Sequence, residues 1–97
     1  MDKEISKEKL DKYFSVTGKA LSKAKSAFNN DELDRAKDFF DMASRYYSDA
    51  EFFCEKGDFV LAFGALNYAH GWLDAGARAK FFLVSDSKLF TVDEEDV

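Results

Sequence analysis

Residues 55–73, EKGDFVLAFGALNYAHGWL, decide the fold of this chain. Gly57 can take the positive φ that ends one helix, and Asp58 can cap the helix that follows. So short a connection predicts that the helices before and after it are antiparallel neighbours. Apolar and small residues then dominate as far as residue 83 without a proline, which predicts one long helix over residues 59–83.

This predicted helix carries apolar residues on two faces. One stripe is typical of a bundle core and consists of Phe59, Phe63, Leu66, His70, Leu73, Ala77 and Phe81. The second stripe consists of Leu61, Tyr68, Trp72, Ala75, Ala79 and Phe82. The combined apolar arc is roughly 260°, whereas a bundle helix with two neighbours needs roughly 140°. We therefore expect the second stripe to be covered by the chain's own tail, by a second copy or by another protein.

Two amphipathic helices are predicted upstream, over residues 3–28 and 31–56. Apolar residues recur in both at the three-and-four spacing of one helical face. Asn30 is the expected N-cap of the second helix, with acidic residues in the first turn. The three helices predict an all-α fold, an antiparallel up-down-up three-helix bundle over residues 1–83. An acidic C-terminal tail, residues 84–97, follows and contains a short extended apolar piece at 89–92.

Composition limits the class of protein. The chain has 97 residues, of which 46% are hydrophobic and 34% charged, and this predicts a single globular domain. The one cysteine, Cys54, cannot form an internal disulfide, and the charged N-terminus lacks the apolar stretch of a secretory signal. No apolar run approaches the roughly 20 residues of a membrane span. We expect a cytoplasmic protein with no membrane segment.

The charge argues against one class of partner. The formal net charge is −5, and no dense cluster of Lys and Arg occurs. Proteins dedicated to nucleic acids gain affinity by neutralising phosphates with such clusters. Nucleic acid is therefore not an expected partner.

Several stretches carry a family resemblance: YYSDA at 46–50, EKGD at 55–58, AFGALNYAHGWLDAG at 62–76 and LFTV at 89–92. In these the chain resembles an archaeal family of unknown function, number 357 in the domain-of-unknown-function series. The resemblance implies a small helical bundle in an archaeal cytoplasm, and it brings no activity with it. The GD turn is weakly similar to nucleotidyltransferase-associated helical domains and tetratricopeptide hairpins. Ribonucleases of the first group place an Arg shortly before a His on one helix, and this chain does not.

The polar residues that could carry chemistry are few. A candidate polar cluster consists of Tyr46, Tyr47, Asn67, His70, Asp74 and Arg78. His70 and Asp74 are four residues apart and therefore neighbours on a helix surface, but local spacing places no nucleophile beside them. We expect His70 to be structural and hydrogen-bonded to Asp74, Tyr46 or Tyr47. One His and one Cys on different helices do not make a zinc site, so no catalytic residue, metal or cofactor is predicted.

Two functions remain open. The first is a non-enzymatic protein-interaction or scaffold module that binds through the second apolar stripe. For this reading the sequence predicts a homodimer with Trp72 near its centre and the tail over one end of the stripe, because large aromatic residues are frequent interface anchors. The alternative is a small-ligand or RNA-processing-associated helical domain built around His70 and Asp74.

Overall fold

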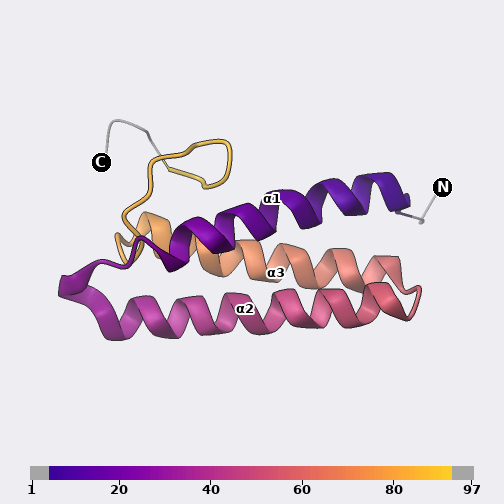
Figure 1. Ribbon diagram of the computed structural model, residues 1–97, viewed down its shortest axis with the longest axis horizontal. Coiled ribbons are helices and arrows are strands. Elements are labelled where there is room, and N and C mark those ends of the chain that lie inside the picture. The colour runs from indigo at the N-terminus through magenta and orange to yellow at the C-terminus, as the bar shows by residue number, and fades with distance from the viewer. Residues whose placement is uncertain (1–4, 93–97) are drawn as a thin grey trace.

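The computed structural model describes residues 5–92 and contains three long helices (Figure 1). The elements are α1 (Lys7–Lys25), the 3-10 turn η1 (Asn30–Glu32), α2 (Leu33–Glu55) and α3 (Phe59–Arg78). They run up, down and up. The α2 helix packs along α3, and α1 lies against both of them, mainly against α3. The predicted all-α antiparallel three-helix bundle is confirmed.

Side-chain caps fix where α1 and the 3-10 turn before α2 begin. Ser6 Oγ accepts the Lys9 N–H at 3.1 Å and starts α1. Asn29 Oδ1 accepts the Asp31 N–H at 3.0 Å, and one 3-10 turn then precedes α2. The expected cap at Asn30 is therefore wrong: Asn29 caps η1, and α2 begins at Leu33 rather than residue 31, after Glu32, whose side chain makes no capping hydrogen bond. Because Ser6 caps α1, that helix starts at Lys7 rather than residue 3.

The turn between α2 and α3 has the predicted form. Gly57 adopts φ 78°, and its N–H donates to the Cys54 carbonyl at 3.0 Å. The Asp58 N–H donates to the Phe53 carbonyl at 2.9 Å, which completes a Schellman motif at the end of α2. Asp58 Oδ1 then accepts the Leu61 N–H at 3.1 Å and caps α3. One residue thus closes α2 and opens α3, which makes the two helices antiparallel.

The end of α3 differs from the prediction: the helix stops at Arg78 rather than residue 83. The Phe81 N–H donates to the Gly76 carbonyl at 2.8 Å and the Lys80 N–H to the Ala77 carbonyl at 3.2 Å, which forms a second Schellman motif. Its left-handed position holds Lys80, at φ 65°, where glycine is usual. That conformation costs a lysine roughly 1–2 kcal/mol, so tertiary contacts must offset it.

Those contacts come from the residues that follow Lys80. Phe82 is fully buried, and its ring lies against Gly76, where a Cβ atom would overlap it. Phe82 also forms an isolated antiparallel bridge with Phe28. This bridge accounts for the end of α1 at Lys25 instead of residue 28, because Phe28 leaves the helix to form it. The side chain of Asn29 adds a hydrogen bond to the Lys80 carbonyl at 2.8 Å.

The core lies around α3, which buries mainly small side chains. Its buried residues are Ala62, Ala65, Leu66, Ala69, Leu73, Gly76 and Ala77. Five of them belong to two clusters, one at each end of the bundle: Ala62, Ala65 and Leu66 to the first, and Leu73 and Ala77 to the second. Leu10, Ala50 and Leu66 form part of the first. Ala24, Ala43 and Leu73 form part of the second, which the tail completes with Phe82, Val84 and Phe90.

The described part of the tail is folded against the bundle in turns. The N–H groups of Leu89 and Phe90 both donate to the Asp86 carbonyl at 3.0 Å, so the expected extended piece at 89–92 is wrong. Asp86 also pairs with Lys23 of α1, with 3.0 Å between Nζ and Oδ2. The hydrogen bond from Lys23 lowers the pKa of the Asp86 carboxyl below its usual value. The acidic end, residues 93–97, lies outside the described residues.

Gly76→Ala tests the end of α3. In an exposed helix interior, replacing glycine by alanine stabilises a protein by about 1 kcal/mol. At Gly76 we expect the opposite, a loss of about 1–3 kcal/mol, because the new methyl group displaces the Phe82 ring. Urea unfolding followed by circular dichroism measures the difference. Gly64→Ala is the matched control, because nothing lies within 4 Å of its Cβ position. An unchanged or raised stability of Gly76→Ala would contradict the contact.

Candidate interaction surface on α3

The exposed side of α3 is uncharged over most of its length. We call this surface the α3 face; it consists of Val60, Leu61, Gly64, Asn67, Tyr68, Gly71, Ala75 and Arg78. Val60 is 55% exposed, Leu61 50% and Tyr68 65%. Arg78, in the last turn, is the one charged member. Contiguous exposed apolar surface of this kind marks a binding site more often than a solvated helix face.

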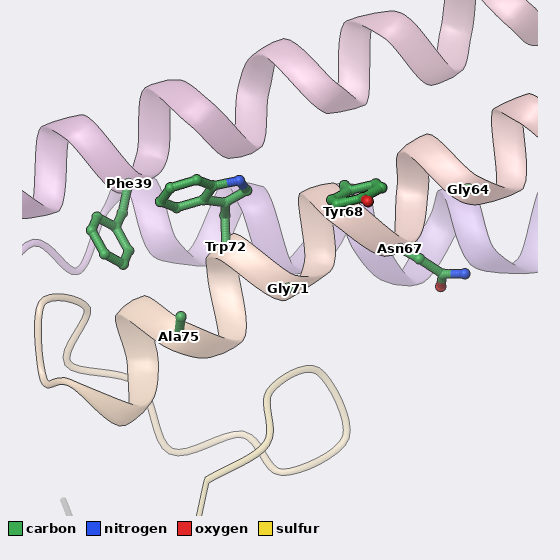
Figure 2. Close-up of a pocket in the computed structure, with 7 residues that line it drawn as sticks. All are labelled: Phe39, Gly64, Asn67, Tyr68, Gly71, Trp72 and Ala75. Atoms are coloured by element: carbon green, nitrogen blue, oxygen red, sulfur yellow. The ribbon is translucent and has the colours of Figure 1, made fainter.

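A groove of about 630 Å³ lies on the α3 face (Figure 2). It is lined by Phe39, Gly64, Asn67, Tyr68, Gly71, Trp72 and Ala75. The two glycines leave it open, because a Cβ atom at either position would meet nothing within 4 Å. Figure 2 shows Trp72 and Phe39 on one side of Gly71 and Tyr68 with Asn67 on the other.

Aromatic contacts with α2 hold the larger residues of the groove in place. The Trp72 ring meets Phe39 edge to face at 5.0 Å between centroids. The Tyr68 ring stacks on Tyr46 of α2 at 5.2 Å, with 19° between the ring planes. Tyr68 is therefore highly exposed, although the stack on Tyr46 holds one face of its ring. Such a residue loses little side-chain entropy when a partner covers it.

The structure keeps most of the predicted second stripe on the surface. Leu61, Tyr68, Ala75 and Ala79 are exposed and Trp72 is half-buried. Phe82 is wrongly included, because α3 ends before it and its side chain is fully buried. No tail residue up to position 92 lines the groove. Instead, the tail docks beside His70 and Asp74, on another side of α3.

His70 joins three segments of the chain through both ring nitrogens. Nδ1 lies 3.0 Å from Oγ1 of Thr17 on α1, and Nε2 lies 2.6 Å from the Leu89 carbonyl oxygen in the tail. A carbonyl oxygen only accepts, so Nε2 carries the hydrogen and donates it. The partners expected from the sequence are wrong: neither Tyr46 nor Tyr47 contacts this ring through a hydrogen bond, and Asp74 Oδ1 is 3.8 Å from Nε2.

Asp74 binds the tail with both carboxylate oxygens. Oδ1 accepts the Thr91 N–H at 2.8 Å, and Oδ2 accepts the Thr91 hydroxyl at 3.1 Å. The neighbouring His70 holds the carbonyl of Leu89, two residues earlier. His70 and Asp74 therefore hold the tail on α3. The Asp74 oxygens that a general base would use are already hydrogen-bonded.

The other members of the predicted polar cluster lie apart. The Tyr47 hydroxyl donates to the Phe14 carbonyl of α1 at 3.4 Å, and burial raises the pKa of this phenol. Tyr46 stacks on Tyr68, and Asn67 and Arg78 are exposed. The six residues thus do not surround one pocket. Thr17 and Thr91, the partners that sequence reasoning missed, are far away along the chain, and no local spacing points to them.

Two features are absent from residues 5–92: a cluster of metal ligands and a helix that could span a membrane. These residues contain no group of three or more His, Cys, Asp or Glu side chains that could hold a metal ion. Within the same residues, no helix combines the length and the apolar character needed to cross a bilayer.

Asp74→Ala tests the attachment of the tail. The substitution removes both acceptors of Thr91, which water can partly replace because the contact is exposed, so we expect a loss of about 1 kcal/mol in unfolding free energy. Amide hydrogen exchange at Thr91 should become faster, while amides inside α2 keep their relative protection. Thr91→Val is the matched control: it removes the hydroxyl bond and retains the N–H bond, so its effect should be smaller. Equal protection of Thr91 in Asp74→Ala and wild type would contradict the role of Asp74.

Comparison with known proteins relates the chain to one family. A family model described as a protein of unknown function (DUF357) matches residues 12–82. That range includes α1 from its second turn, all of α2 and α3, and Phe82. Neither a curated protein nor a solved structure gives a significant match. Because the family model covers well over half of the sequence, including the groove, the chain belongs to the DUF357 family, whose function is unknown.

Proposed function

We propose that this protein is a non-enzymatic protein-interaction module that works as a homodimer and binds through the α3 face. The observation that carries the proposal is a pair of glycines in the middle of α3, the half-buried Gly64 and the exposed Gly71, whose Cβ positions meet nothing within 4 Å, beside the exposed ring of Tyr68.

No contact within residues 5–92 requires glycine at position 64 or 71. Each exposed glycine inside a helix costs about 1 kcal/mol of stability relative to alanine. The other three glycines have a structural reason. Gly57 takes a positive φ, Gly76 receives Phe82, and a Cβ at Gly18 would lie 2.9 Å from the Tyr47 hydroxyl. A docked helix supplies the missing reason for Gly64 and Gly71, since glycine lets two helix backbones approach closely.

The distribution of charge supports the same surface. The exposed sides of α1 and α2 are rich in charged residues, such as Lys12, Lys19, Asp38 and Arg45. The α3 face has none before Arg78. Interface centres are generally depleted of charged residues and enriched in tyrosine and tryptophan. The groove on the α3 face contains one of each, Tyr68 and Trp72.

The alternative function, a small-ligand or RNA-processing domain, would need His70 and Asp74 to be available. Their hydrogen bonds to Thr17, Leu89 and Thr91 favour a structural role instead. This supports the non-enzymatic part of the proposal. The archaeal cytoplasm that the family resemblance implies stays a prediction from the sequence.

Tyr68→Glu tests the homodimer. A carboxylate at the most exposed aromatic residue of the α3 face would have to be desolvated on association, so we expect the variant to be monomeric. Sedimentation equilibrium from about 10 to about 500 μM, a range suited to a weak interface, should show dimer only for the wild type. Tyr68 is a better probe than Trp72, because Trp72 also packs on Phe39 within the monomer.

Phe52→Glu is the matched control for this experiment. Phe52 is 54% exposed on α2, does not line the groove, and contacts the neighbouring Phe53 ring. The control should associate like the wild type. A wild type that stays monomeric throughout the concentration range would refute the homodimer, and equal weakening by both variants would place the interface elsewhere.

A further inference from the structure

The geometry of the groove points to how the two copies meet, and this inference rests on the proposed function. We infer that the α3 helices of two copies pack antiparallel about a two-fold axis, with Tyr68 of each copy above Gly71 of the other. The occupant of the groove is thus the same groove of a second copy.

The spacing along the α3 face fits a helix–helix seam. Leu61, Gly64, Tyr68, Gly71, Ala75 and Arg78 follow one another at alternating intervals of three and four residues. This is the spacing at which residues of one helix interlock with those of another. It is realised here on the solvent side of α3 rather than in the core.

The groove is symmetric along the helix, which sets the register. Six of its lining residues belong to α3, and they are spaced evenly about the point midway between Tyr68 and Gly71. A two-fold interface uses the same patch of both copies, so its axis passes through the centre of that patch. An axis at this point places Tyr68 opposite the partner's Gly71 and Gly64 opposite the partner's Ala75.

The two pairings are sterically compatible: in the first a large side chain faces a gap, and in the second two small residues meet. The exposed Tyr68 ring enters the space that the absent side chain of the partner's Gly71 leaves open, and the contact occurs twice. At Gly64 and the partner's Ala75 two small residues meet, which brings the backbones close together. A monomer surface that carries both the projecting ring and the matching gap on one helix is self-complementary.

Charge selects antiparallel over parallel packing. Arg78 lies on the exposed side of the last turn of α3 and makes no ion pair within residues 5–92. The exposed carboxylate of Asp58 lies at the opposite end of the same helix. Antiparallel packing brings the basic end of each helix to the acidic end of its partner. Parallel packing would bring two Arg78 side chains together, which is unfavourable.

The size of the surface limits the strength of the dimer. A helix of 20 residues is about 30 Å long and about 10 Å wide, so its face covers about 300 Å² per copy. Standard interfaces bury about 800 Å² per partner, and smaller ones belong to weak or transient complexes. We therefore expect a reversible dimer.

Disulfide trapping tests the register. In a Cys54→Ser background, the single variants Gly64→Cys and Ala75→Cys are made, and one is labelled with 15N. The two are mixed, oxidised and analysed by mass spectrometry. Antiparallel packing places position 64 level with the partner's position 75, within disulfide reach, and separates identical positions by about 17 Å along the axis. In parallel packing, identical positions would lie level with each other, and position 64 would lie about 17 Å from the partner's position 75 along the axis.

We expect mixed disulfides between positions 64 and 75 to form at least tenfold faster than either homodimeric disulfide. Faster homodimeric disulfides would overturn the inference and leave the proposed function intact. A dimer in sedimentation that gives no fast disulfide of any kind would also overturn the register. Failure of the proposed function itself has a different signature, a Cys54→Ser parent that sediments as a monomer.

Discussion

The contact between the Phe82 ring and Gly76 is the constraint on which the rest of the structure depends. It can form only if the chain reverses directly after α3, and the left-handed Lys80 provides that reversal. The reversal carries Phe82 to the bridge with Phe28, which ends α1. From there the tail runs beside α1 and α3 and delivers Leu89 and Thr91 to His70 and Asp74. A larger residue at position 76 would disturb every one of these placements.

The small residues of α3 serve two purposes on two sides of one helix. On the buried side, Ala62, Ala69 and Ala77 let neighbouring helices approach closely. On the exposed side, Gly64 and Gly71 leave a groove that nothing in the described chain fills. The α3 segment therefore carries more apolar residues than packing within one molecule buries.

The fold could be predicted from local signals in the sequence. The exact helix ends could not, because they depend on contacts between residues far apart in the chain. Gly57 and Asp58 indicated the turn between α2 and α3, because the φ of glycine and the cap of aspartate act within a few residues. The ends of α1 and α3 could not be predicted in the same way. They depend on a bridge between Phe28 and Phe82, and apolar residues near a helix end look like more helix. The pairing of His70 and Asp74 was visible as a spacing of four. Its role in holding the tail was not, since Thr17 and Thr91 reach it only through the fold.

The bridge between Phe28 and Phe82 also bears on the order in which the protein assembles. The two residues enclose all of α2 and α3, so closing this loop in an unfolded chain carries a large entropic cost. The turn at Gly57 is local, and the contacts between α2 and α3 can form before the loop closes. Once these helices lie antiparallel, residues 28 and 82 are brought towards each other and the remaining cost is small. The helical hairpin of α2 and α3 can therefore form first, and α1 and the tail can dock onto it.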